Sequence, residues 1–293
     1  MASNLARRVA FAVVAIPTVL WVLYLGGWPL VGLLSLVGAL GTWEVYGLAQ
    51  RQSVYPFAGL GLLGAVAIPV VAYSGLVAAS QREAVACFVC PAPVAWIPLA
   101  ALWLMAIFGV AIRTRAPSER PLAAIAITVV APLYASALLA FVLVLRGAAP
   151  RSWMGLGAAA LPLVLVWVCD TVAMAAGRLL GGPKLAPVLS PNKTWAGAIG
   201  GTLAAVAAAV AYGPLVLARL DAAPLPPPGQ LAVLGAVVSV FGQLGDVAES
   251  LLKRESGVKD SSSRIPGHGG VLDRLDSLYF AVPAAAILGS LFL

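Results

Sequence analysis

Acidic residues inside apolar stretches are the side chains of this sequence best suited to chemistry. Only 11 of the 293 residues are acidic. Asp170 lies within the hydrophobic run LVLVWVCDTV, Asp246 lies near the end of another, and Asp273 and Asp276 lie at the start of a third. A charge inside a bilayer costs about 2.5–3.5 kcal/mol on insertion scales, so an acid that remains there usually has a function or a partner. These four carboxylates are therefore candidate metal ligands.

The spacing of the acids supports this hypothesis. Asp246 and Glu249 are three residues apart, as are Asp273 and Asp276, and residues three apart share one face of a helix. Magnesium prefers carboxylates together with water and substrate phosphates. We predict that Asp246, Asp273 and Asp276 bind a metal directly or through water, and that Asp170 completes its shell or orients a lysine. For Glu249, and for Glu44 in an earlier apolar run, a structural ion pair is an equally good interpretation.

A basic, glycine-rich loop lies between the two acid pairs, in SLLKRESGVKDSSSRIPGHGGVLDRLD at 250–276. Gly269 and Gly270 allow backbone N–H groups to approach an anion closely. His268, the only histidine, lies beside them. A polyphosphate bound together with a metal suits this composition, although the segment lacks a P-loop pattern. The cationic side chains of the loop are Lys253, Arg254, Lys259, Arg264 and Arg274.

This segment resembles the signature of the phosphatidate cytidylyltransferase family, also called CDP-diacylglycerol synthases. A second stretch, at 169–201, resembles the family's acid-then-basic-loop block, but Ala196 stands where many members have Glu or Gln. The resemblance covers roughly residues 120–293. The matching positions of the signature are Ser250, Lys253, Arg254, Lys259, Asp260, His268, Gly269, Gly270, Asp273, Arg274 and Asp276. Those of the second block are Asp170, Gly177, Lys184, Ser190, Pro191, Lys193, Thr194 and Trp195.

The resemblance implies transfer of CMP from CTP to phosphatidate, giving CDP-diacylglycerol and pyrophosphate. The implied cofactor is Mg²⁺, alone or with a second cation, and a homodimer is expected at the level of the family. For His268 we favour loop ordering or phosphate contact, with general acid catalysis as the alternative. The implied catalytic residues are Asp246, Lys259, Asp273 and Asp276. The implied substrate-binding residues are Ser190, Lys193, Lys253, Arg254, His268, Gly269, Gly270 and Arg274.

Two other functions use similar residues. A CTP-dependent lipid kinase shares the nucleotide and the membrane acceptor, but transfers the γ-phosphoryl group and releases CDP. A secondary transporter or anion channel also uses intramembrane acids. The charges here cluster at one face, and the two halves of the sequence show no symmetry, which disfavours a carrier built from repeats.

The elements that position these residues are apolar helices. Hydrophobic residues make up 61% of the chain and charged residues 10%, whereas a soluble domain has about 25% charged residues. A spanning helix needs roughly 20 apolar residues, so we predict an all-α, polytopic integral membrane protein with about nine transmembrane helices. We expect them at 6–26, 28–48, 56–79, 93–112, 121–145, 156–178, 195–219, 230–252 and 275–293.

The distribution of basic residues predicts the orientation. A cytoplasmic N-terminus puts nearly all of the 18 Lys and Arg residues inside and leaves outside only Arg82, Arg146, Arg151 and Arg219. Loops 179–194 and 253–274 are then cytoplasmic, in a multi-pass protein of the cell (inner) membrane. The net charge of +7 follows from this topology and from attraction to the anionic lipid bilayer, and requires no nucleic acid. We divide the chain into a scaffold at 1–115 and a catalytic region at 116–293.

Overall fold

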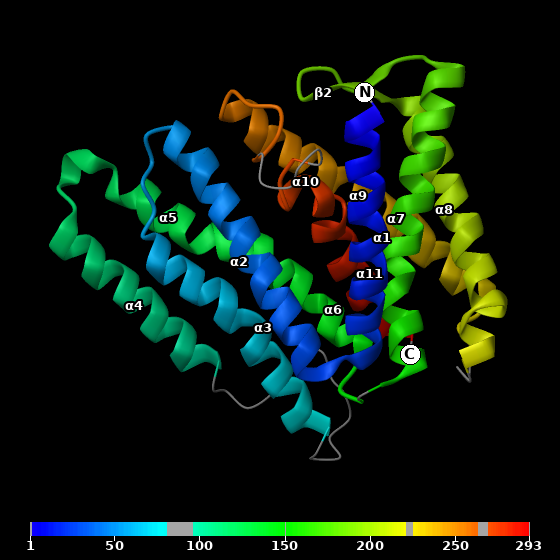
Figure 1. The fold of residues 1–293 in the computed structure, drawn as a ribbon, viewed down its shortest axis with the longest axis horizontal. Helices are drawn as coiled ribbons and strands as arrows, with labels where there is room; N and C mark the ends of the chain where they lie inside the picture. Colours follow the sequence, from blue (N-terminus) through cyan, green and yellow to red (C-terminus); the bar gives the residue numbers. More distant parts are fainter. Residues whose placement is uncertain (1, 81–95, 150, 221–224, 263–268, 293) are drawn as a thin grey trace.

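The computed structural model describes residues 2–80, 96–149, 151–220, 225–262 and 269–292, with side chains from residue 13 onward (Figure 1). Eight helices among these residues are long and apolar enough to cross a membrane. The predicted all-α, multi-pass membrane fold is therefore confirmed. Helix α1 is long, but its described apolar part, Val13–Leu25, is shorter than a span. The count of nine and the side of the N-terminus stay predictions.

Each predicted apolar segment coincides with a helix or with a pair of consecutive helices. Figure 1 shows that the long helices pack side by side. The helices are α1 (Ala2–Leu25), α2 (Gly27–Arg51), α3 (Ala58–Ser80), α4 (Trp96–Thr114), α5 (Pro121–Pro132), α6 (Leu138–Arg146), α7 (Trp153–Leu180), α8 (Trp195–Leu215), α9 (Pro228–Glu255), α10 (Leu272–Leu275) and α11 (Leu278–Phe292). Short helical turns lie at η1 (Pro117–Glu119), η2 (Leu133–Ala137, a π-turn joining α5 to α6) and η3 (Leu217–Leu220).

Local sequence sets where the helices near the site begin and end. The Ser152 and Thr194 hydroxyls accept hydrogen bonds from the backbone N–H groups of Gly155 and Gly197, at 2.9 and 3.1 Å, and so cap α7 and α8. Helix α7 ends at Gly181, whose φ of 64° is a backbone conformation that glycine adopts without strain. The chain then turns out of the bundle into the first basic loop.

Small residues bring helices α7, α8 and α9 close together. A Cβ atom on Gly201 would lie 2.8 Å from the Cys169 carbonyl oxygen, and one on Gly235 would lie 2.8 Å from that of Ala205. Apolar side chains gain little by leaving lipid for a helix interface, so such close backbone packing is a main source of helix association in membranes. Close backbone contact at small residues is therefore a main source of the association of α7, α8 and α9.

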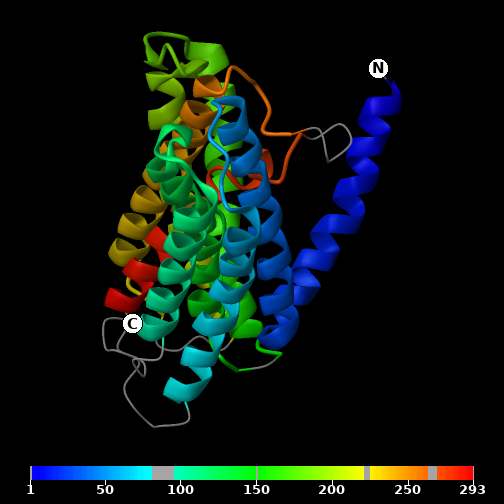
Figure 2. The same ribbon diagram turned by 90° about the vertical axis from the view of Figure 1, so that its left-hand side faces the viewer.

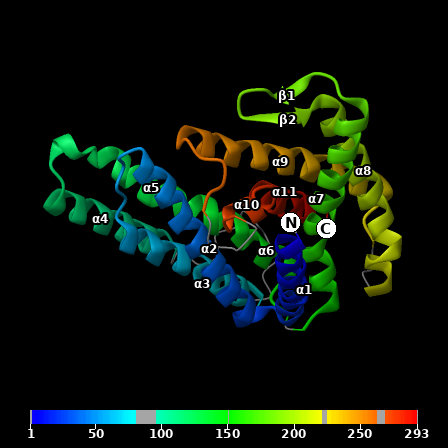
Figure 3. The same cartoon turned by 45° about the horizontal axis from the view of Figure 1, so that its top comes forward.

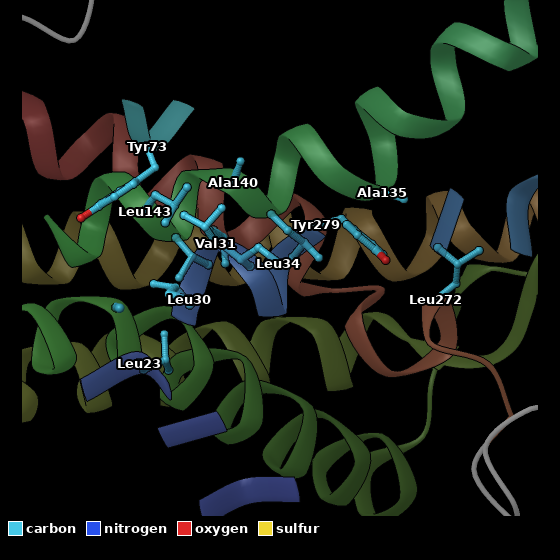
Figure 4. Close-up of a cluster of buried hydrophobic side chains, with 14 of the residues drawn as sticks. Leu23, Leu30, Val31, Leu34, Tyr73, Ala135, Ala140, Leu143, Leu272 and Tyr279 are labelled. Carbon is cyan, nitrogen blue, oxygen red and sulfur yellow. The ribbon is translucent and has the colours of Figure 1, made fainter. Parts of the chain in front are cut away.

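Two clusters of buried side chains meet at α11. Tyr279 and Val282 belong to a cluster formed with α2 and α6, shown in Figure 4. Ala281 and Ala285 belong to a second cluster, formed with α7, α8 and α9. Helix α11 thus contributes side chains to both clusters. Leu272, at the start of α10, is fully buried in the first cluster. The predicted division at residues 115 and 116 stays a prediction.

The loop predicted at 179–194 contains a small antiparallel hairpin of β1 (Lys184–Ala186) and β2 (Ser190–Thr194). Figures 1 and 3 show it at the same end of the molecule as α10 and the end of α9. The N-terminal end of α1 also lies at this end, and Figure 2 shows α1 diverging from the other helices toward its N-terminus. The two polar loops therefore occupy one end of the bundle.

Candidate active site

The two basic loops, far apart in sequence, are in direct contact. The Arg254 Nε atom at the end of α9 donates to the Leu189 carbonyl oxygen in the hairpin, at 3.3 Å. Lys193 on β2 forms an ion pair with Asp246 on α9, with 2.6 Å between Nζ and Oδ2. The structure therefore joins residues 184–194 to the C-terminal part of α9, as a shared phosphate site requires.

Three of the predicted metal ligands form an acidic cluster, defined here as Asp170, Asp246 and Asp276. Asp170 on α7 and Asp276 after α10 each lie close enough to Asp246 for their charges to repel. A Cβ atom on Gly245 would lie 2.6 Å from the Asp276 carbonyl oxygen, so glycine is needed for α9 to approach the α10–α11 junction this closely. Lys193 pairs with Asp246 in this cluster, and Lys253 lies close enough to Asp276 for their opposite charges to attract.

The other acids belong to a separate, more buried network. Lys253 Nζ lies 2.7 Å from both Glu249 Oε2 and Asp273 Oδ1. The Glu249 side chain is fully buried, and those of Asp273 and Lys253 are 7% and 12% exposed. The structural ion pair considered for Glu249 is therefore present. Asp273 Oδ2 accepts three further hydrogen bonds, from Ser261 N at 2.9 Å, Ser261 Oγ at 2.9 Å and Gly270 N at 2.8 Å.

The two i, i+3 pairs thus divide their members between the cluster and the network. Helix α10 ends at Leu275, so Asp273 and Asp276 do not lie on one continuous helix. Asp276 accepts a hydrogen bond from the Ser277 N–H at 2.7 Å and lies near Asp246, whereas Asp273 faces Lys253. Spacing alone predicted that the two members of each pair act together on one helical face. In the structure, one member of each pair belongs to the acidic cluster and the other to the ion network.

Glu44 is the site residue that sequence reasoning left undecided. It is buried on α2, and its carboxylate accepts four hydrogen bonds from residues 261–272. These donors are hydroxyl groups and backbone N–H groups. A buried acid at the inner end of an apolar span was the available signal, but its partners lie 217 to 228 residues away and no local pattern identifies them.

The glycines of the loop are there because neighbouring groups approach closely. Gly269 has a φ of 80°, and a Cβ atom on it would lie 2.7 Å from Asp273 Oδ2. A Cβ atom on Gly270 would collide with Ser261 Oγ and the Glu44 carboxylate. These two glycines are therefore required by the packing of carboxylates around the loop backbone, in addition to any contact with an anion.

The predicted cationic residues differ in exposure and in partners, and Arg254 donates to the carbonyl oxygens of Leu189 and Val258. Arg254, Lys259 and Arg274 are exposed, while Ser190 and Lys193 are partly buried in the hairpin. Lys253 differs, because its ammonium group is committed to two carboxylates. His268 and Arg264 lie outside the described residues.

Comparison with known proteins gives the family. The model of the cytidylyltransferase family matches residues 6–292, almost the whole chain. The chain belongs to the cytidylyltransferase family. Proteins named phosphatidate cytidylyltransferase are similar to it: one from Brucella abortus is 51% identical over 128 residues, one from Haemophilus influenzae 46% over 125 and one from Staphylococcus epidermidis 44% over 125.

These alignments are partial. They cover 44%, 41% and 43% of this chain, and 45%, 41% and 46% of the respective relatives. The chain thus spans less than half the length of the curated relatives it matches. The predicted family is confirmed, and the activity of those relatives bears on this chain only as a proposal.

The acidic cluster fits a hard cation in donor type and charge. Carboxylate oxygens are the protein ligands that Mg²⁺ favours, and polyphosphate and water supply the remaining positions. Asp170, Asp246 and Asp276 are suitable, whereas both oxygens of Asp273 are engaged by protein donors. Within the described ranges, no three such side chains stand together at ligating distance. The predicted metal centre of Asp246, Asp273, Asp276 and Asp170 stays a prediction.

Proposed function

We propose that this chain transfers CMP from CTP to phosphatidate, giving CDP-diacylglycerol and pyrophosphate. A phosphate oxygen of the lipid forms a bond to the α-phosphorus of CTP, and the bond from that phosphorus to the oxygen bridging to the β-phosphate breaks. The lipid phosphate is already anionic, so no strong general base is needed. The observation that carries this proposal is the family match over residues 6–292, joined to two basic loops beside an acidic cluster.

The chain's own residues lower the cost of bringing two polyanions together. The exposed Arg254, Lys259 and Arg274 bind phosphate oxygens, and the hairpin residues Ser190 and Lys193 approach from the opposite side. Fixed cations at a partly dehydrated site stabilise charge that develops during transfer. Asp170, Asp246 and Asp276 would hold Mg²⁺, alone or with a second cation, which would supply positive charge to the α-phosphate and the departing pyrophosphate.

The position of the loops supports a site at the cytoplasmic face of the cell (inner) membrane. Both loops lie at one end of the helices. The excess of basic residues at this end favours a cytoplasmic location, where CTP is available. The acyl chains of phosphatidate remain in the bilayer beside the apolar helices. We extend the proposal to a homodimer, which the family resemblance implies and which cross-linking in membranes tests.

Labelled CTP tests the reaction. Purified protein in phosphatidate-containing vesicles receives Mg²⁺ and CTP labelled at either the α- or the γ-phosphate. We expect α-label in the lipid product and γ-label in pyrophosphate. Appearance of γ-label in lipid together with free CDP would show a lipid kinase. Movement of solute across the vesicle without any lipid product would show a transporter, and either result would overturn the proposal.

A further inference from the structure

We propose that Glu44 is a positioning residue of the transfer site, which holds the catalytic loop in register through both of its ends. The inference rests on the proposed function, because it gives Glu44 a purpose in that reaction. Glu44 lies on α2, far in sequence from the other site residues. Among the described residues it bonds Ser261, Ser262, Val271 and Leu272. Glu44 and these four residues are called here the loop clamp.

The clamp uses both oxygens of the carboxylate symmetrically. Oε1 accepts from Ser262 Oγ at 2.7 Å and from Val271 N at 3.0 Å. Oε2 accepts from Ser261 Oγ at 2.9 Å and from Leu272 N at 2.9 Å. Each oxygen therefore takes one hydroxyl from the beginning of the segment and one backbone N–H from its end. A single side chain on α2 thereby fixes the distance between the two ends of the loop.

Ser261 links Glu44 to the buried ion network. Its hydroxyl oxygen lies 2.9 Å from both Glu44 Oε2 and Asp273 Oδ2. A hydroxyl has one proton to donate, so it serves one carboxylate at a time, while the Ser261 N–H remains bonded to Asp273. Asp273 in turn holds Lys253. A displacement of the clamp should therefore also move the start of α10 and the Lys253 ammonium group.

The fold does not need Glu44 for the placement of α2. That helix is held by apolar packing, with Leu30, Val31 and Leu34 buried in the first cluster, which Figure 4 shows. Glu44 also adds a negative charge where two polyanions must bind, so it does not serve substrate affinity. We therefore infer that Glu44 acts by the position of its two acceptor oxygens and not by its charge.

Glutamine at position 44 breaks the clamp whichever way its amide is turned. Each carboxylate oxygen faces one backbone N–H, from Val271 or from Leu272. The amide offers one oxygen and one NH₂ group, so one of these N–H groups always faces another donor. The serine hydroxyls can rotate to accept, but the N–H groups cannot. An unsatisfied buried donor is costly, so the segment shifts to relieve it.

The test combines kinetics with hydrogen exchange. For Glu44→Gln we expect kcat to fall roughly tenfold to a hundredfold with a smaller change in KM for CTP, because geometry and not charge attraction is lost. Exchange of the Val271 and Leu272 amides should accelerate, while that of the buried part of α2 stays unchanged. Glu44→Asp keeps two acceptor oxygens and should recover part of kcat. Glu255→Gln, an exposed acid on the adjacent end of α9, is the matched control and should match the wild type.

A double-mutant cycle with Ser261→Ala sharpens the result. If the clamp acts as one unit, the loss in Glu44→Gln/Ser261→Ala is smaller than the product of the single losses. Wild-type kcat together with unchanged exchange in Glu44→Gln overturns the proposal, as does exchange that accelerates through all of α2. Should Glu44→Gln fail to insert, Glu44→Asp and Ser261→Ala are compared by the same two readouts. Absence of CMP transfer in the wild type overturns the proposed function alone, since exchange still tests the clamp.

Discussion

Buried cations occur at both ends of this molecule, and the two ends neutralise them differently. Arg146, at the end of α6, is buried and donates to three carbonyl oxygens: Nε to Leu23, Nη2 to Tyr24 and Nη1 to Ala149, at 2.5, 2.6 and 2.8 Å. Leu23 and Tyr24 lie in the last turn of α1, where the helix dipole is negative. At the other end, Lys253 and Lys193 pair with carboxylates.

The kind of partner distinguishes a cation that serves the fold, such as Arg146, from the cations at the proposed site. Carbonyl groups are permanent parts of the backbone, so the Arg146 contacts tie α1 to α6 and occupy N–H donors on all three guanidinium nitrogens. At the site, carboxylates outnumber the cations that they are shown to bind, and three of them repel one another. Such an arrangement is unfavourable alone and becomes favourable when a cation and a polyphosphate arrive. Substitutions at the two ends should therefore affect different measurements.

The largest effect is expected in the acidic cluster. Asp276→Asn should lower kcat by about a thousandfold or more, because a ligand for transition-state charge neutralisation is lost. Thermal stability should be unchanged or higher, since one repelling charge is gone. CMP transfer and the unfolding temperature are measured on the same preparation. Glu119→Gln, at the exposed turn η1, is the control. Full activity of both Asp276→Asn and Asp246→Asn would remove the metal-site assignment.

Substitutions in the buried ion network should change both CMP transfer and the unfolding temperature. Lys253→Met leaves Glu249 and Asp273 without their cation, and breaking such a buried pair costs about 3–5 kcal/mol of stability. Activity should fall as well, because Asp273 keeps its bonds to the loop but loses its tie to α9 through Lys253. In Glu249→Gln/Lys253→Met, part of the lost stability should return while activity stays low. Full recovery of activity in the double variant would show that Lys253 serves the fold only.

The sequence was informative about the spans and less so about the contacts between them. Apolar runs alone predicted the eight described segments that are long enough to cross a membrane, because the bilayer imposes length and hydrophobicity on each one. The hairpin of β1 and β2 was missed, since a few residues of strand are stabilised by tertiary context. Glu44 was undecided for a similar reason. Its partners lie more than 200 residues away in sequence, and only the packing of α2 against α10 brings them together.

At the end of the molecule opposite the site, Arg146→Met should show the opposite pattern to Asp276→Asn. The variant leaves the Leu23, Tyr24 and Ala149 carbonyl groups without their donor, which should cost about 1–3 kcal/mol of stability. At temperatures where the protein remains folded, kcat should equal that of the wild type. Unfolding temperature and kcat are compared with those of Arg219→Gln, an exposed cation. A loss of kcat without loss of stability would contradict the division between the two ends.

The smallest effect is expected at an exposed cation of the site. Lys259 is exposed, so its attraction for a phosphate is screened by water and salt. Lys259→Ala should raise KM for CTP by roughly threefold to tenfold, the range expected for one ordinary hydrogen bond, because solvent screening weakens the contribution of the charge. The difference from the wild type should shrink as the NaCl concentration rises, which a direct steric effect would not show. Lys259→Arg keeps the charge and should stay within about twofold of the wild type. If Lys259→Ala instead abolished kcat at every salt concentration, Lys259 would act at the reacting phosphate. The residues needed for the chemical step would then include this exposed cation as well as the acidic cluster.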